Sequence, residues 1–319
     1  MKSRLHLVLA LALVTLAGLA SAQEWPTKPV KLVVPSSPGG GTDVFARLLA
    51  QSLTEALKQQ FIVENRPGAS GNIGAQAVAS AAPDGYTFLV ASNSSIAINP
   101  ALFKNLPFSA ERDLTTVARG VMAVNVLIVN PTVGVKNVNE FIALAKQKPD
   151  TLVFGSAGTG SSPYLGVRMI EETAGLKFVH APYKGVAPAY QDLLAGRLQF
   201  MYTDLASALS YVNAGKLNVL AIDRKTSLLP GAPTFAEAGW PKFDSPTSFS
   251  VMAPAAVPPA ILQRMAAEVG KALRVLAPRL EQQALVPVFD TPAEFAASLK
   301  KERADWAAFI QRNNITPDQ

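Results

Sequence analysis

The sequence contains no cysteine among its 319 residues, and only one of its two histidines, His180, follows residue 22. Disulfide bonds and thiolate metal sites are therefore excluded, and a metal site would need clustered carboxylates, of which we find none. A Ser-His-Asp triad would have to use His180, which lies in an apolar, strand-like stretch. The chain also lacks a cluster of Lys and Arg interleaved with aromatic residues, so a nucleic-acid partner is not expected.

The first 22 residues have the pattern of a secretory signal peptide. Lys2 and Arg4 precede an apolar stretch at residues 7–20, and an A-x-A cleavage site at residues 20–22 precedes Gln23. An amphipathic or buried N-terminal helix is the alternative, but no polar face interrupts the run. We therefore expect export to the periplasm and cleavage before Gln23, with no lipid or membrane anchor because no cysteine or second apolar span follows.

The chain after the expected cleavage site carries a small positive excess. Lys and Arg number 29 against 23 Asp and Glu, which gives +6, and removing Lys2 and Arg4 leaves +4. A field of this sign favours anionic ligands. A soluble protein that is merely basic would show the same balance.

Short apolar runs alternate with segments of helical periodicity, which predicts an α/β fold with largely parallel sheets. Thr291, Pro292 and Glu294 form a capping-box pattern and predict the start of the last helix. No long polar linker separates the segments, so the domains should share one compact body. We predict a signal peptide at 1–22, a discontinuous domain 1 at 23–123 and 224–319, and domain 2 at 124–223.

Two glycine-rich loops, each between an expected strand and an expected helix, are the most informative feature. Glycine lets the backbone approach a ligand closely, and the first N–H groups of a helix have no intrahelical partner, so each junction can hold an anion. The candidate ligand-binding residues are Ser36, Ser37, Gly39, Gly40, Gly41, Thr42 and Asp43 in the first loop, and Ser156, Ala157, Gly158, Thr159, Gly160, Ser161 and Ser162 in the second. One such loop is often only a tight connection, but two predict a pair of jaws facing one cleft. Asp43 either contacts a ligand amine or, as we favour, caps the following helix.

Nucleotide and hydrolase motifs are incomplete. Gly155 and Gly160 have the spacing of a Walker A loop, but Ser161 stands where the lysine is required. A dinucleotide fingerprint beginning at Gly158 fails because Pro163 stands where the third glycine belongs. No G-x-S-x-G elbow is present either. We therefore expect no catalysis, no cofactor and no metal, with an enzyme acting on a carboxylate as the alternative.

A series of short motifs follows in one order along the chain. They are Pro38-Gly39-Gly40 with Asp43, Glu64-Asn65-Arg66-Pro67-Gly68, Gly71-Asn72-Ile73-Gly74, Pro83-Asp84-Gly85-Tyr86-Thr87, Ile98-Asn99-Pro100, Gly155-Ser156-Ala157-Gly158, Pro182-Tyr183-Lys184-Gly185, Leu193-Leu194-Ala195-Gly196 and Thr291-Pro292. Taken together and in this order, the motifs are specific to one protein family. Over nearly the whole chain after residue 22, the sequence resembles the Bug family, the substrate-binding receptors associated with tripartite tricarboxylate transport.

The resemblance implies a two-domain periplasmic-binding-protein (Venus-flytrap) fold that closes on a ligand between its domains. It implies that backbone groups of the two glycine loops hold a ligand carboxylate and that Ser92, Asn93 and Ser94 line the cleft. Asp204 occupies the position of a family aspartate that can face the ligand, and a helix cap is its equal alternative. The implied function is periplasmic capture of a small carboxylate for the membrane permease subunits of a tripartite tricarboxylate transporter, by a receptor that we expect to be a monomer. The carboxylate would be a di- or tricarboxylate, an acidic amino acid or an aromatic acid.

Two departures from the family pattern bear on the ligand. Ser36 and Ser248 stand where members often carry large aromatic residues. If both border the cleft, the pocket should be wider and accept a bulkier acid. A ligand-responsive signalling receptor and a binder of a neutral molecule such as nicotinamide are the alternative functions.

Overall fold

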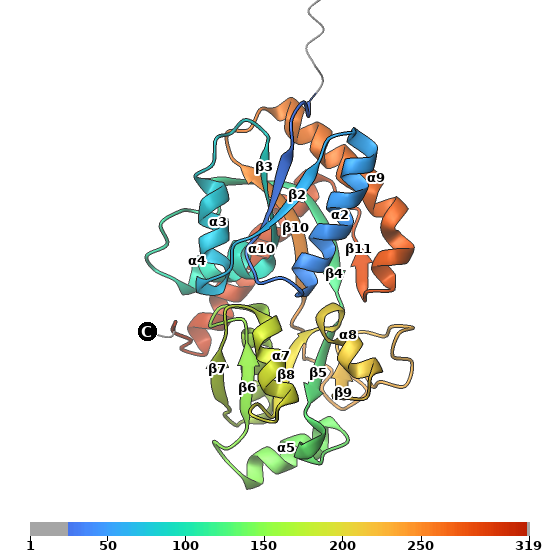
Figure 1. Cartoon of the computed structure of the whole chain (residues 1–319). Coiled ribbons are helices and arrows are strands. Elements are labelled where there is room, and N and C mark those ends of the chain that lie inside the picture. Colours follow the sequence, from blue (N-terminus) through green and yellow to red (C-terminus); the bar gives the residue numbers. More distant parts are fainter. Residues whose placement is uncertain (1–24, 318–319) are drawn as a thin grey trace, which may run out of the picture.

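The computed structural model describes residues 25–317, and they form two lobes, each built on one β-sheet (Figure 1). The predicted signal peptide lies outside the described residues. The sheet of the upper lobe has the order β11-β4-β10-β3-β1-β2, and that of the lower lobe has the order β7-β6-β8-β5-β9. The upper strands are β1 (Val30–Val34), β2 (Phe61–Asn65), β3 (Thr87–Ser92), β4 (Leu114–Ala123), β10 (Thr247–Pro254) and β11 (Leu285–Pro287). The lower strands are β5 (Asn125–Val129), β6 (Val153–Ser156), β7 (Val179–Pro182), β8 (Phe200–Asp204) and β9 (Asn218–Ile222).

Helices cover both faces of the upper sheet. On one face lie α2 (Gly41–Leu57) and α9 (Pro259–Glu281), and on the other α3 (Asn72–Ala79), α4 (Asn99–Leu102) and α10 (Pro292–Arg312). Phe45, Leu49 and Leu53 recur at a spacing of four residues, so α2 buries one apolar stripe against β1. The predicted capping box is confirmed at α10, where Thr291 accepts from the Glu294 backbone and the Glu294 side chain accepts from the Thr291 backbone.

The lower sheet is covered in the same way. Helices α5 (Val138–Gln147) and α6 (Ser162–Ala174) pack on one face, and α7 (Val186–Leu194) and α8 (Leu205–Asn213) on the other. The expected parallel character holds for β6 with β7 and β8, and for β1 with β2 and β3. Strands β5 and β10, which follow the crossings between lobes, run antiparallel to their neighbours.

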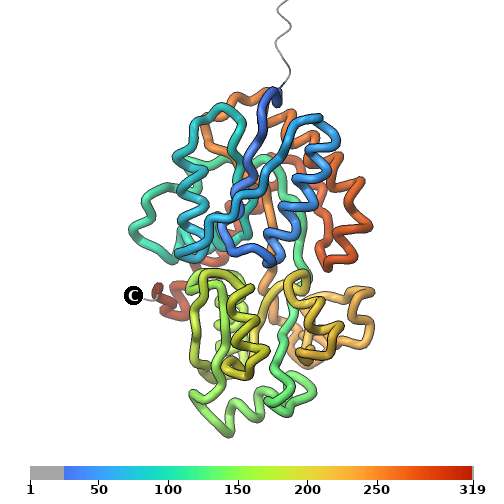
Figure 2. The backbone as a smooth tube through the Cα atoms, viewed as in Figure 1, coloured from blue at the N-terminus to red at the C-terminus, as the bar shows by residue number. Residues whose placement is uncertain are grey.

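The chain crosses between the lobes in two adjacent segments, around Val124 and around Ser245 (Figure 2). Asn125 ties the two together, because its side-chain amide donates to the Ser245 carbonyl at 3.1 Å and to Asp223 Oδ2 at 3.1 Å. Residues 224–246, which we assigned to domain 1 from sequence, pack on the lower lobe: the Phe235 N–H donates to the Ile222 carbonyl, and the ring of Phe243 contacts that of Tyr202. We therefore propose that the second domain boundary lies near Ser245.

Candidate ligand-binding cleft

The two predicted glycine loops lie on opposite lobes and face each other. The first follows β1 and leads into α2, and the second follows β6 and leads into α6. Because helix starts follow the carboxyl ends of parallel strands, both lobes bring their helix N-termini to the same gap.

Direct hydrogen bonds join the lobes at this point. The Ser162 backbone N–H donates to Ser94 Oγ at 2.9 Å, and Ser162 Oγ donates to Asn93 Oδ1 at 2.8 Å. Asn93 is itself fixed, since its amide donates to Glu302 Oε1 at 2.6 Å and to the Pro246 carbonyl at 3.0 Å. A third link runs from Ser70 Oγ to the Thr159 carbonyl at 2.5 Å. The structure is therefore a closed arrangement in which the jaws touch.

A small cavity of about 50 Å³, partly open to solvent, lies between the loops. Among the candidate residues, it is lined by Ser36, Thr42, Ser92, Ser94, Ala157 and Ser161. It is also lined by residues that we did not select from the sequence, namely Pro35, Gly68, Ser70, Gly71, Lys184 and Gly185. This volume holds only one or a few water molecules, so a carboxylate ligand requires a wider separation of the lobes.

Three helix N-termini with glycine caps converge on this cavity. Gly40 precedes α2, Gly71 precedes α3 and Gly185 precedes α7, and none of the three supplies a side-chain cap. Thr42, Gly71 and Gly185 also line the cavity. The lining residues within the described chain include no Asp or Glu, although the Asp204 carboxylate accepts from the Gly41 N–H at the start of α2, so the remaining N–H groups of these helix ends present partial positive charge to the cavity.

The start of α6, in contrast, is already occupied by protein groups. Ser161 Oγ accepts from the Tyr164 N–H, Ser94 Oγ accepts from the Ser162 N–H, and Pro163 has no N–H to offer. From the sequence we expected both glycine loops to offer backbone N–H groups of a helix start to the ligand. At α2 the Gly41 N–H is taken by Asp204 and at α3 the Asn72 N–H is taken by the Ala69 carbonyl, so the later N–H groups of α2 and α3 and the start of α7 are left for that role, while the second loop lines the cavity with Ala157 and Ser161.

Within the second loop, most candidate residues hold the loop and the lobe contact in shape. Ser156 Oγ accepts from the Gly158 N–H at 3.0 Å and shares a 2.7 Å hydrogen bond with His180 Nε2. The His180 ring stacks on Phe154, with 4.8 Å between ring centroids. Gly158 and Gly160 have φ angles of 102° and 94°, a region that favours glycine. The Ser156–His180 hydrogen bond therefore helps to hold the second loop in shape.

The hydroxyl oxygens of Ser36 and Ser37 are buried without a hydrogen-bond partner in the described part of the chain. Ser36 borders the cavity, and Ser37 packs against Gly185 of the opposite jaw. Buried hydroxyl groups usually have a partner, so these two are suited to bind a ligand oxygen. Ser248, by contrast, is paired with Met122 inside the upper sheet and is not among the residues lining the cavity. The condition for a pocket widened at both positions is therefore not met.

Asp43 holds the first loop in shape through hydrogen bonds. Its carboxylate accepts from the Gly39 N–H at 3.0 Å, from Arg47 Nε at 2.9 Å and from the Asn65 amide at 2.9 Å. Burial raises the pKa of Asp43, but these hydrogen bonds outweigh it and hold the pKa below its usual value. The expectation that Asp43 caps the following helix is wrong, because Asp43 lies in the first turn of α2, whose N-cap is Gly40 without a side-chain cap. Its three donors hold the loop that precedes the helix instead.

Asp204 is the N-cap of α8, where it accepts from the Ser207 N–H at 2.9 Å. Its carboxylate also meets the start of α2 in the other lobe, at Gly41. Burial raises its pKa, and hydrogen bonds from Ser207 and the Gly41 backbone partly offset that rise. Of the two interpretations of Asp204, the geometry matches the helix cap and adds a contact between the lobes.

A conformational feature missed in the sequence is the turn at residues 68–71. All four residues, Gly68, Ala69, Ser70 and Gly71, have positive φ angles of 122°, 47°, 53° and 92°. Two of them are not glycine, so the turn is strained, and strain of this kind concentrates at functional sites. The only signal in the sequence was the glycine-rich motif around Pro67.

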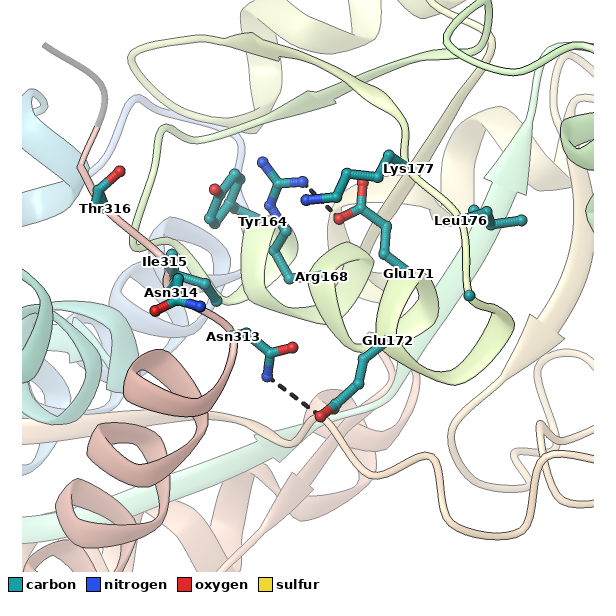
Figure 3. Close-up of a pocket in the computed structure, with 11 residues that line it drawn as sticks. Tyr164, Arg168, Glu171, Glu172, Leu176, Lys177, Asn313, Asn314, Ile315 and Thr316 are labelled. Atoms are coloured by element: carbon teal, nitrogen blue, oxygen red, sulfur yellow. Dashed lines mark hydrogen bonds and ion pairs between the residues drawn. The ribbon is translucent and has the colours of Figure 1, made fainter.

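A larger pocket, about 460 Å³, lies between α6 and the C-terminal residues 313–316 (Figure 3). Among its charged lining residues, Arg168 pairs with Glu171 at 2.5 Å, and Glu172 pairs with Arg312 outside the lining at 2.8 Å. It lacks the converging helix ends of the cleft. Elsewhere in residues 25–317 no group of three or more potential metal ligands is found, and no helix there is long and apolar enough to cross a membrane.

Comparison with known proteins agrees with the family resemblance found in the sequence. A family profile described as the tripartite tricarboxylate transporter family receptor, TctC, matches residues 45–315. The chain is 34% identical to Protein BugT of Bordetella pertussis over 318 residues, covering 97% of each chain.

Three solved structures are similar over most of their length. A Rhodopseudomonas palustris protein, Rpa4515, with adipate is 30% identical with a TM-score of 0.87, covering 92% of this chain and 100% of that one. MatC of the same organism, with bound malate, is 28% identical with a TM-score of 0.84, covering 90% and 100%. A TctC solute-binding protein from Polaromonas without ligand is also 28% identical, but its TM-score is 0.64, with 90% and 99% covered.

Proposed function

Because the chain belongs to the TctC family of tripartite tricarboxylate transporter receptors, we propose that it captures a small carboxylate anion between its two lobes. It then delivers this solute to membrane permease subunits. Family receptors are periplasmic, and we propose the same location here, reached through the predicted signal peptide. The protein acts as a monomer and performs no catalysis on its ligand.

The observation that carries this proposal is the convergence of three glycine-capped helix starts on one cavity without a carboxylate in its lining. Each charge-assisted hydrogen bond contributes about 1.5–3 kcal/mol net. A micromolar Kd needs about 8 kcal/mol, so a few such bonds, with Ser36 and Thr42 as further donors, are sufficient.

Ligand entry requires the lobes to separate. The cavity volume is only about 50 Å³, and the Ser94–Ser162 contact holds the two lobes together beside it. We propose that the lobes rotate about the paired crossings near Val124 and Ser245. The closer match to the malate-bound relative than to the ligand-free relative of equal identity supports this motion.

A thermal-shift screen of residues 23–319 tests the proposal. The ligands are C3–C6 dicarboxylates, citrate, acidic amino acids, aromatic acids, unbranched monocarboxylates and neutral nicotinamide. A ligand at 100 times its Kd adds about 2.7 kcal/mol to the stability of the folded state, which gives a clear rise in Tm. Stabilisation by nicotinamide alone, with no carboxylate active, would overturn the carboxylate assignment.

A further inference from the structure

Lys184 lies in the short connection between β7 and α7, on the lower jaw of the cleft. It is the one charged residue among the described residues that line the cavity. The predicted site did not include it, although Pro182-Tyr183-Lys184-Gly185 was among the motifs of the family resemblance.

The backbone on both sides of Lys184 is fixed at the cleft. The Tyr183 N–H donates to the Ser156 carbonyl at 3.0 Å, and the Tyr183 hydroxyl donates to Asp192 at 2.5 Å. On the other side, Gly185 packs so closely on Ser37 of the upper lobe that a Cβ there would lie 3.1 Å from Ser37 Cβ and still closer to its Oγ. The origin of the Lys184 side chain is therefore held at the contact between the jaws.

The Lys184 side chain itself has no interaction partner among the described residues. Lys184 is exposed, and its ammonium group makes no hydrogen bond or ion pair with any residue that the structure describes. A lysine on a flexible four-carbon stem can follow an anion at variable distance, which a rigid backbone site cannot do. It is also next to the uncapped start of α7, whose N-terminal N–H groups add positive potential on the same side.

The two jaws offer different kinds of binding groups to the cavity. The upper jaw offers the starts of α2 and α3 and the unpartnered Ser36 hydroxyl, which together suit one carboxylate at fixed geometry. The lower jaw offers Lys184 and the start of α7, which suit a second anionic group. We propose, resting on the proposed function, that Lys184 is a specificity-determining residue that pairs with the distal anionic group of a doubly charged ligand. It thereby selects dianions over monoanions of the same length.

The test compares ligands of equal carbon number: succinate with butyrate, glutarate with pentanoate, and adipate with hexanoate. Calorimetric titration gives Kd for the wild type and for Lys184→Gln, which removes the charge and keeps a similar length. We expect the wild type to bind at least one diacid about tenfold more tightly than its monoacid partner. Lys184→Gln should lose most of this preference while its monoacid affinity stays the same, and Lys184→Arg should retain it.

The control variant is Lys177→Gln, another exposed lysine of the lower lobe, which lines the pocket in Figure 3 and not the cleft. It should leave every Kd unchanged. Equal loss of diacid and monoacid binding in Lys184→Gln, or no loss of either, would refute the role of Lys184 while leaving the carboxylate receptor intact. Failure of the wild type to bind any acid would instead overturn the proposed function, and the inference with it.

Discussion

Gly41 provides the sharpest test of the closed arrangement. It is the first residue of α2, and a Cβ built on it would lie 2.7 Å from Asp204 Cγ of the other lobe, closer still to the Asp204 carboxylate oxygen, and 2.9 Å from Phe249 Cζ. Gly40, one residue earlier, would place its Cβ at 3.4 Å from Val186, an ordinary contact. Gly41→Ala therefore disfavours closure, and Gly40→Ala, which adds the same methyl group one residue earlier, is the matched comparison.

The magnitude follows from the cost of overpacking, about 1–3 kcal/mol. Asp204 approaches Gly41 only when the lobes meet, so the overpacking destabilises mainly the closed state. It therefore raises Kd by about 5- to 150-fold. Phe249 belongs to the same lobe as Gly41, so the ligand-free Tm of Gly41→Ala should also fall somewhat. The assay is calorimetric titration with the best carboxylate of the thermal-shift screen, alongside the Tm of each ligand-free variant.

Gly41→Ala binding within twofold of the wild type would refute the reasoning, because the lobes would then bind ligand without the Gly41–Asp204 approach. A double-mutant cycle adds a second check. Shortening the partner in Gly41→Ala with Asp204→Ala should recover part of the affinity lost in Gly41→Ala alone. Additive losses would mean that the two residues do not meet in the ligand-bound state.

Three further changes separate the site from its scaffold. Gly158→Val should weaken ligand binding strongly while the protein stays folded, because Gly158 has φ 102° and its Cβ would lie 2.8 Å from Ser70 Oγ of the other lobe; wild-type affinity in titration would contradict this. Thr291→Ala should lower the free energy of unfolding by about 1 kcal/mol in urea and leave Kd unchanged, because it removes the α10 capping box far from the cleft. Asp43→Asn should destabilise the protein at pH 7, and the difference from wild type should shrink as pH falls. The Asp43 pKa is depressed in the folded state, so its contribution is present above the unfolded value of about 3.9 and is lost as pH falls through the folded value. A pH-independent difference in the urea midpoint would show that the charge of Asp43 is not what stabilises the loop.

The sequence by itself determined the class of fold and predicted the two loops between which we propose the ligand cleft. Apolar runs alternating with helical periodicity were enough to predict the α/β alternation and the start of α10, because such elements carry local signals, for example the Thr291 capping box. The two glycine loops were found for the same reason, since a strand, a glycine run and a helix start are adjacent in the chain. Six of the candidate residues border the cavity between the lobes.

Only the tertiary structure decided which groups at those loops remain available to a ligand. The start of α6 is satisfied by Ser94, which lies 68 residues earlier, and the Gly41 end of α2 is met by Asp204 from the other lobe. Lys184, Gly71 and Gly185 reach the cavity because the sheets bring the ends of β7 and β2 beside those of β6 and β1. Hydrogen bonds between residues so distant in sequence leave no local pattern, so the sequence predicts the loops at which we propose that an anion binds, and only the packing of the lobes shows which groups there are free to hold it.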